Sequence, residues 1–293
     1  MPIDPDIAIG ADLGATTFSW TSTDVLLYHL ALGAGAAPTD ATELRYVLED
    51  RLHVLPTFGV VAPGFRTFEP PALSFPGIDV DLSKVLHGTQ SITVNGPIPP
   101  SGDAVARSRI ADVWDKEKAA VVIHETVVTS ATGEPLWTTS SAIFARGEGG
   151  FGGQRGPSTA VEVPGREPDR VLEVHVLPQQ ALLYRLCGDR NPLHADPEFA
   201  ARAGFDRPIL HGLCTYGMVC KSVVDSELGG DATRVASFAT KFAGVVFPGE
   251  TLRVRVWQTE AGYVVTATAA DREDAPVLAD TVLTVASQNS RRR

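Results

Sequence analysis

The clearest hydrophobic pattern in the chain is that of a long amphipathic helix in its second half. Apolar residues recur at intervals of three and four after Gly212, and Gly229 is a typical residue to end such a run. These apolar residues are Leu213, Tyr216, Val219, Val223 and Val224. A shorter helix precedes it, because Asp196 and Pro197 form a helix cap followed by a proline at the first helical position. The pattern therefore predicts two helices, over residues 197–203 and 212–228.

Alternating apolar and polar residues predict antiparallel strands elsewhere. Leu252, Val254 and Val256 alternate with two arginines, which is typical of a strand with one buried face. Other runs are rich in Val, Ile and Thr and are bounded by turn residues. The predicted strands cover residues 84–94, 103–114, 119–129, 136–146, 171–176, 235–240, 251–257, 263–269 and 277–285. Two further helices are predicted, one over 179–186 and one capped by Ser22 or Thr23.

The two halves of the chain repeat each other in the same order. Residues 26–30 and 182–186 share the pattern Leu-Leu-Tyr-X-Leu, and two later pairs of segments also correspond. These pairs are 54–59 with 209–213 and 95–102 with 245–249. We therefore predict an N-terminal repeat over 1–147, a Gly/Pro-rich linker over 148–169 and a C-terminal repeat over 170–293. The glycine-rich run that opens the linker lacks the Gly-Lys-Ser/Thr end of a phosphate-binding loop, which favours the linker interpretation.

The candidate chemistry lies in residues 184–194, Tyr-Arg-Leu-Cys-Gly-Asp-Arg-Asn-Pro-Leu-His. Asn191 precedes a proline, which disfavours a helix, and the Gly188-Asp189 step favours a bend. A bend would bring the Asp189 carboxylate and the His194 imidazole together, and such a pair can hold one water for general acid–base chemistry. The alternative is an Asx turn at Asp189 and a histidine whose hydrogen bonds are satisfied in the core.

The start of the long helix at Gly212 is a second candidate feature. The first N–H groups of a helix have no partner within it and carry a partial positive charge, so they can stabilise a developing oxyanion. A glycine at this place lets a substrate carbonyl approach the backbone closely.

The motif of residues 184–194, followed by Gly212 at the head of a long helix, resembles hydratase 2, the MaoC-like (R)-specific 2-enoyl-CoA hydratases. This family includes double-hotdog forms and the hydratase domain of peroxisomal multifunctional enzyme type 2. The resemblance runs through nearly the whole chain and is nearest to actinobacterial members associated with steroid side-chain degradation. It implies an α+β double-hotdog fold, in which each of two repeats wraps an antiparallel sheet on a central helix.

The resemblance also implies the reaction and the residues that perform it. A trans-2-enoyl-CoA would gain water reversibly to give an (R)-3-hydroxyacyl-CoA, in fatty-acid or sterol side-chain β-oxidation, with no metal and no cofactor. Asp189 and His194 would hold the water, Asn191 would orient it, and the Gly212 N–H would stabilise the enolate-like oxygen. Which of the two ionisable groups protonates C2 stays open. The implied substrate-binding residues are Tyr184, His211 and Lys241; a pocket-lining or structural role is the alternative for His211, and a solvated side chain for Lys241.

The first repeat lacks the Asp, Asn and His of the motif, so we expect it to build the substrate site rather than run acid–base chemistry. Its central helix would begin near Pro56 and break at Pro63-Gly64 within about two turns. A shortened central helix would leave room for a bulky acyl group, for example a steroid-linked one. The alternative is a helix that only kinks and repacks.

Composition narrows the function classes further. The 293 residues are 44% hydrophobic, enough for a sizeable core, and the net charge of −10 without a basic stripe argues against nucleic-acid binding. Three cysteines without metal-ligand spacing suit a reducing cytoplasm. The N-terminus shows no signal-peptide pattern, and no stretch has the length of an uncharged membrane span. We therefore expect a cytoplasmic enzyme that acts on acyl-CoA as a homodimer.

Three alternatives share this fold. A hotdog thioesterase and a dehydratase acting on carrier-protein thioesters are enzymes, and a non-catalytic acyl-CoA-binding subunit is not. The intact Asp-x-Asn-Pro-x-His run argues against the thioesterase and against the non-catalytic subunit.

Overall fold

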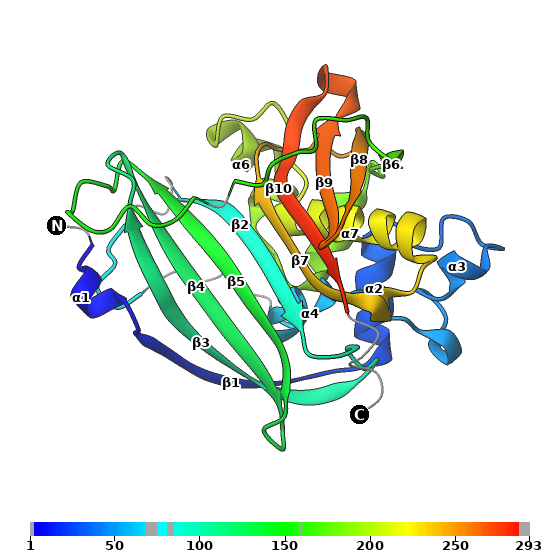
Figure 1. Ribbon diagram of the computed structural model, residues 1–293, viewed down its shortest axis with the longest axis horizontal. Coiled ribbons are helices and arrows are strands. Elements are labelled where there is room, and N and C mark those ends of the chain that lie inside the picture. Colours follow the sequence, from blue (N-terminus) through cyan, green and yellow to red (C-terminus); the bar gives the residue numbers. More distant parts are fainter. Residues whose placement is uncertain (1–2, 68–74, 81–84, 159, 287–293) are drawn as a thin grey trace.

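The computed structural model describes residues 3–67, 75–80, 85–158 and 160–286, which form one continuous antiparallel sheet of ten strands with helices packed against it (Figure 1). The strand order is β1-β3-β4-β5-β2-β7-β10-β9-β8-β6. The strands of the first half are β1 Asp12–Trp20, β2 Val85–Val94, β3 Gly102–Asp115, β4 Ala119–Ser130 and β5 Pro135–Arg146. Those of the second half are β6 Arg170–His175, β7 Val235–Phe242, β8 Thr251–Thr259, β9 Gly262–Ala269 and β10 Ala275–Val285.

The strand order confirms the repeat. Read from the two edges inward, the halves run β1-β3-β4-β5-β2 and β6-β8-β9-β10-β7, which is the same topology twice. The halves meet where β2 pairs with β7, with Thr89 opposite Lys241 and Thr93 opposite Ser237. The sheets therefore pair edge to edge, as a double hotdog requires; the predicted boundaries of the linker stay a prediction.

The helices show the same repeat, with one large asymmetry. The described α-helices are α1 Pro5–Ala8, α2 Ser22–Ala31, α3 Ala41–Leu44, α4 Phe58–Val61, α5 Gln180–Tyr184, α6 Pro197–Arg202 and α7 Gly212–Leu228. Helix α7 ends at Gly229 in the left-handed conformation, and Asp196 caps α6, both as predicted. In the first half the counterpart of α7 is only α4 and a 3-10 turn, η2 Ala62–Gly64, because Pro63 interrupts it.

One hydrophobic core extends through both halves. Tyr28 and Leu32 of the first half lie against Gly217 of α7, where a Cβ would approach the Tyr28 hydroxyl to 2.7 Å. Figure 1 accordingly shows α2 beside α7. Buried aromatic residues from both halves, including Trp137 and Phe238, belong to the same cluster. The two repeats thus bury a shared core, as the paired sheets lead one to expect.

Several elements differ from the sequence predictions. The sequence does not predict strand β1, because most of its residues are exposed and apolar and polar residues do not alternate regularly along it. The predicted cap of α2 at Ser22 or Thr23 is wrong: Thr21 caps the helix, in a reciprocal capping box with Asp24. Lys84, the first residue of one predicted strand, lies outside the described residues. Within the described residues, no helix is long and apolar enough to cross a membrane.

The glycine-rich segment of the predicted linker surrounds a carboxylate of the protein itself. Asp115 accepts hydrogen bonds from the backbone N–H groups of Gly150 at 2.9 Å, Gly152 at 2.8 Å and Glu117 at 2.8 Å. The Gly150 hydrogen bond is the largest cause that lowers the pKa of Asp115. Because Asp115 takes up these N–H groups, the segment has the structure of an anchored connection and not of a phosphate loop.

A buried ionic cluster fastens α7 to the first half. Lys221 Nζ lies 2.6 Å from Glu43 Oε1 and 2.8 Å from Asp225 Oδ2, and the Tyr46 hydroxyl donates to Asp225 Oδ1 at 2.7 Å. The Lys221 ammonium also lies 5.0 Å from the centre of the Tyr46 ring. Removing the lysine would leave two carboxylates close together with no cation between them.

We therefore expect Lys221→Met to destabilise the fold by about 3 kcal/mol, because it removes one partner of a largely buried ion pair. Urea unfolding at neutral pH measures the loss. Lys118→Met changes an exposed lysine and serves as the control. Equal stability of the two variants would show that the cluster does not hold the halves together.

Candidate active site

The motif segment folds as a chain of short turns. Helix α5 continues into one 3-10 turn, η4 Arg185–Cys187, which ends at Gly188 with φ 112°. A second 3-10 turn, η5 Pro192–His194, follows, and Asn191 caps it. Gly188 lies against the first half, since a Cβ there would overlap the carbonyl oxygen of Gly64. Only glycine satisfies both the positive φ and this close approach.

Two side-chain hydrogen bonds make the predicted bend. The Asp189 carboxylate accepts from the Asn191 N–H at 3.0 Å, and the Asn191 side-chain oxygen accepts from the Leu193 N–H at 3.0 Å. Both are local turns of the kind that Asp and Asn favour. They bring Asp189 and His194 to one place, where the ligating atoms of Asp189, His194 and His211 all lie within 4.8 Å of one another. The Asx turn that the sequence offered as a structural alternative is therefore also what brings the candidate acid–base pair together.

The His194 ring is buried and held by its Nδ1 atom. Nδ1 lies 2.9 Å from the carbonyl oxygen of Ile209. Because a carbonyl can only accept, Nδ1 carries the proton and Nε2 is left as the base. Burial lowers the pKa of His194, while the nearby Asp189 charge opposes that shift. The imidazole is thus neutral at neutral pH and can take a proton at Nε2.

Gly212 occupies the predicted place at the first turn of α7. Its backbone faces the Phe242 ring of β7, where a Cβ would come to 3.2 Å from Phe242 Cε1. The N–H of a first helical residue has no acceptor within its own helix. The arrangement therefore leaves a donor and the positive end of a 17-residue helix close to the segment that carries the dyad of Asp189 and His194.

The structure brings two of the three predicted substrate-binding residues to the dyad. The rings of His194 and His211 stack with their centres 3.7 Å apart, and His211 Nε2 lies 3.3 Å from the Asp189 carbonyl oxygen. Tyr184 is the last residue of α5, and the centre of its ring lies 5.0 Å from the centre of the His211 ring. Both Tyr184 and His211 are buried, so they support the dyad from behind.

Lys241, the third predicted substrate-binding residue, directly precedes Phe242 on β7. It pairs with Thr89 across the seam between the halves, and its half-exposed side chain lies 3.7 Å from the Asp280 carboxylate. The structure therefore places Lys241 next to the seam but does not bring its ammonium into the cluster of Asp189, His194 and His211.

The first half contributes a residue that sequence reasoning missed. His87 of β2 is exposed to solvent, and its ring lies 4.7 Å from that of Phe242. Desolvation by the protein packed on one side of the ring lowers the pKa of His87, while hydrogen bonds with Thr89 and Gln90 and the charge of Asp189 oppose this shift. No acidic residue at a suggestive spacing marks this histidine in the sequence. Only the pairing of β2 with β7 carries it to the site.

Asp189, His194 and His211 offer donor atoms of the kinds that divalent metals accept, but their geometry does not fit an ion. A metal bound by imidazole lies in the plane of the ring, about 2 Å from the nitrogen. The rings of His194 and His211 stack face to face at an interplanar angle of 29°, so one ion close to both cannot lie in both planes. Asp189 and His194 therefore suit proton transfer better than metal binding.

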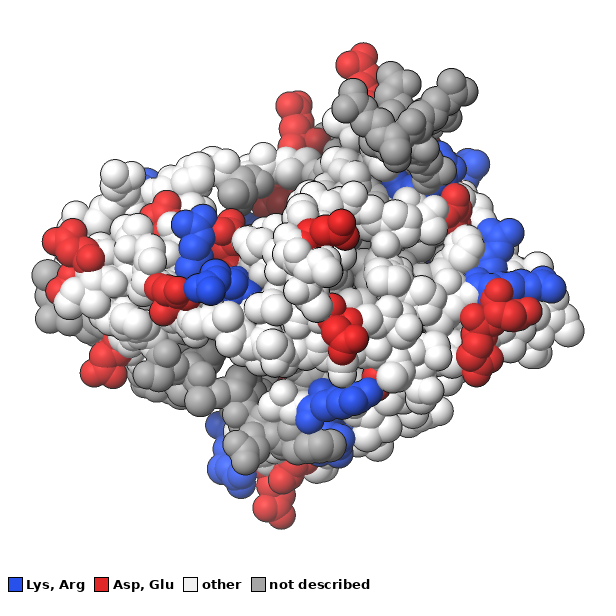
Figure 2. Space-filling view, turned by 90° about the horizontal axis from the view of Figure 1, so that it is seen from below, with Lys and Arg blue, Asp and Glu red and all other residues white. Residues whose placement is uncertain are grey.

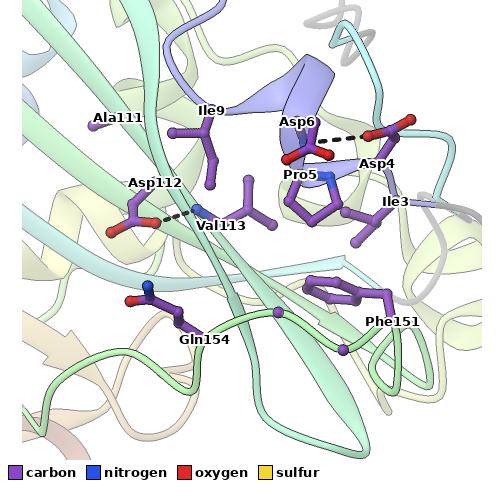
Figure 3. Close-up of a pocket in the computed structure, with 12 residues that line it drawn as sticks. Ile3, Asp4, Pro5, Asp6, Ile9, Ala111, Asp112, Val113, Phe151 and Gln154 are labelled. Atoms are coloured by element: carbon purple, nitrogen blue, oxygen red, sulfur yellow. Dashed lines mark hydrogen bonds between the residues drawn. The ribbon is translucent and has the colours of Figure 1, made fainter.

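A cavity of about 820 Å³ lies on the first half, away from these residues (Figure 3). It is bounded by α1, β3 and the glycine-rich segment, and Asp4, Asp6 and Asp112 give it an acidic rim. None of its lining residues belongs to the motif. Figure 2 shows acidic and basic residues interspersed among neutral ones, with no continuous basic area on the face drawn.

Comparisons with known proteins agree with this geometry. The profile of the MaoC like domain matches residues 159–274, and that of the MFE-2 hydratase 2 N-terminal domain matches residues 18–147. The chain is 58% identical to enoyl-CoA hydratase ChsH3 of Mycobacterium tuberculosis over 95% of its length and 97% of that protein. It is 40% identical to 3-hydroxyacyl-thioester dehydratase Y of the same organism, over 90% of this chain and 91% of that one. The crystal structure of a MaoC-like dehydratase from Phytophthora capsici superposes with a TM-score of 0.88 at 28% identity, covering 99% and 100% of the two chains.

The contact between Gly188 and the first half leads to a prediction. We expect Gly188→Ala to lower kcat by ten-fold or more and to destabilise the fold by about 1–3 kcal/mol, because a Cβ strains the positive φ and overlaps the Gly64 carbonyl. Steady-state kinetics and urea unfolding measure the two effects. Gly133→Ala, at a positive φ in open space, is the control for backbone strain alone. If both variants lose stability equally and only slightly, the Gly64 contact does not support the catalytic loop.

Proposed function

This chain belongs to the MaoC-like hydratase 2 family, and we propose that it hydrates a trans-2-enoyl-CoA to an (R)-3-hydroxyacyl-CoA in fatty-acid or sterol side-chain β-oxidation. The observation that carries the proposal is the convergence of the Asp189 carboxylate with a neutral His194 whose Nε2 is free to act as a base. The expected direction is hydration, and dehydration of a 3-hydroxyacyl thioester is the same reaction in reverse.

The dyad would activate one water. The thioester carbonyl withdraws electrons and makes C3 electrophilic, so the water oxygen bonds to C3 as a proton leaves it for the dyad. The electron pair of the double bond moves toward the thioester oxygen, where the Gly212 N–H would donate a hydrogen bond to the developing charge. A proton from the dyad then bonds to C2 and restores the thioester. Positioned acid–base groups contribute typically ~10²–10⁴-fold, and a single oxyanion donor ~10²–10³-fold.

Asn191 would act mainly through the turn. Its side-chain oxygen is engaged by the Leu193 N–H, so it fixes the 3-10 turn that carries His194. The amide NH₂ group remains as a donor that can orient the water. Lys241 would meet the CoA phosphates near the seam, and the buried Tyr184 and His211 would support the dyad that faces the reacting carbons.

We further propose that the substrate carries a bulky acyl group. The first half has a four-residue helix, α4, where the second half has the 17-residue α7. This difference supports a larger acyl site on the side of the first half, and the sequence resemblance supports a steroid-linked substrate. The Gly64 carbonyl against Gly188 shows that the broken helix also packs on the catalytic loop. We further propose a cytoplasmic homodimer.

The dyad is tested by Asp189→Asn and His194→Ala. Each should lower kcat/KM by ~10²–10⁴-fold, and the double variant should be little worse than the worse single one, because the two groups act on one water. The enoyl-thioester absorbance reports turnover. Asp206→Asn and His175→Ala, both exposed, are matched controls. Near-normal turnover by Asp189→Asn would move the chemistry elsewhere, and losses that multiply fully would mean two independent roles.

Substrate size is tested with a panel of short, long and steroid-linked enoyl-CoA esters. We expect kcat/KM to be highest for a bulky ester, because the shortened helix leaves its space to the acyl group. Free thiol is measured in parallel, since release of CoA would identify a thioesterase instead. Turnover of crotonyl-CoA far above every bulky ester would contradict the large acyl site.

A further inference from the structure

We infer that His211 is a positioning residue that sets the orientation of both members of the dyad, and not a substrate-binding residue. This inference rests on the proposed function. It starts from the two contacts of one buried side chain. The face of the His211 ring stacks on His194 at 3.7 Å, and its Nε2 edge reaches the Asp189 carbonyl oxygen at 3.3 Å.

The segment that carries His211 makes a second contact with His194. Ile209, two residues earlier, accepts the hydrogen bond from His194 Nδ1 at 2.9 Å. One short segment therefore fixes the imidazole by its edge, through Ile209, and by its face, through His211. The Leu210 N–H in turn donates to the Val246 carbonyl at 2.7 Å, which anchors the segment to the second half.

His211 itself has little freedom to move. It is the residue that precedes α7, and its carbonyl accepts from the N–H groups of Cys214 at 3.1 Å and Thr215 at 3.2 Å. The Tyr184 ring packs 5.0 Å from the His211 ring, and Tyr28 of the first half packs 6.1 Å from Tyr184. The His211 imidazole is thus packed between the first turn of α7 and the buried rings of Tyr184 and Tyr28.

The chemical state of His211 suits a support rather than a base. The Asp189 carbonyl can only accept, so Nε2 carries the proton and Nδ1 is unprotonated. That Nδ1 is buried and finds no hydrogen-bond partner among the described residues. Burial, and after it the proximity of His194, lowers the pKa of His211 to about 3. A neutral ring can stay stacked while His194 takes a proton, whereas a second cation would repel it.

Both contacts need a histidine at this position. Phenylalanine could stack on His194 but would leave the Asp189 carbonyl without its donor. Glutamine could donate to that carbonyl but would remove the aromatic face. The two substitutions therefore separate the contacts, and neither one alters Asp189 or His194.

The experiment compares His211→Phe and His211→Gln with the wild-type enzyme, and uses His175→Gln, an exposed histidine on β6, as the control. We expect kcat to fall ten- to a hundred-fold in both variants with KM within three-fold of wild type. A rise in KM at unchanged kcat would overturn the inference, because it would make His211 a substrate-binding residue. A kcat within two-fold of wild type in both variants would overturn it as well.

Imidazole ¹⁵N NMR supplies a readout that does not depend on turnover. We expect wild-type His194 to be protonated at Nδ1 and His211 at Nε2, and we expect the His194 resonances to shift in both variants but not in His175→Gln. A wild-type His211 protonated at Nδ1 would overturn the inference even if no variant folds. If the wild type hydrates no enoyl-CoA while these tautomers are found, the proposed function fails and the arrangement of the histidines stands.

Discussion

The antiparallel pairing of β2 with β7 is the interaction on which the rest of the structure depends. It joins two five-strand repeats into one sheet, with Thr89 opposite Lys241, and so allows a single core to extend through both halves. Without that core, α7 would expose the apolar residues around much of its surface. The same pairing places His87 of the first half beside Phe242, which in turn lies against Gly212. The candidate site is therefore composite, although its acid–base groups come from one repeat.

The candidate site is oriented chiefly by backbone carbonyls and short polar turns. Asp189 and Asn191 each use a side-chain oxygen to hold an N–H two residues further along. The carbonyls of Ile209 and Asp189 each accept from one imidazole, which assigns a protonated nitrogen to His194 and another to His211. Such hydrogen bonds reach from rigid elements and need no mobile partner, so they can keep a base in one orientation through a reaction.

The two repeats have diverged in a complementary way. The second keeps the long helix and the Asp-x-Asn-Pro-x-His segment, whereas the first keeps neither. The first has instead a helix broken at Pro63, whose Gly64 carbonyl meets Gly188 at the start of the loop that carries Asp189 and His194. It also supplies Glu43 and Tyr46, which surround Lys221 of α7. The repeat without the candidate acid–base groups thus supports the repeat that carries them.

The amino-acid sequence predicts the repeat, nine of the ten strands, α6, α7 and the segment that carries Asp189 and His194, because local patterns specify each of them. Hydrophobic periodicity locates α7, and Pro and Asn residues fix the turns. It missed β1, whose pairing with β3 and not its own pattern makes it a strand. It also missed the position of His87 beside Phe242 and left His211 with open alternatives. Contacts between residues far apart in the chain decide these cases, and tertiary packing alone supplies such contacts: the β2–β7 register carries His87 to Phe242, and the stacking of His211 on His194 appears only once α7 has docked in the shared core.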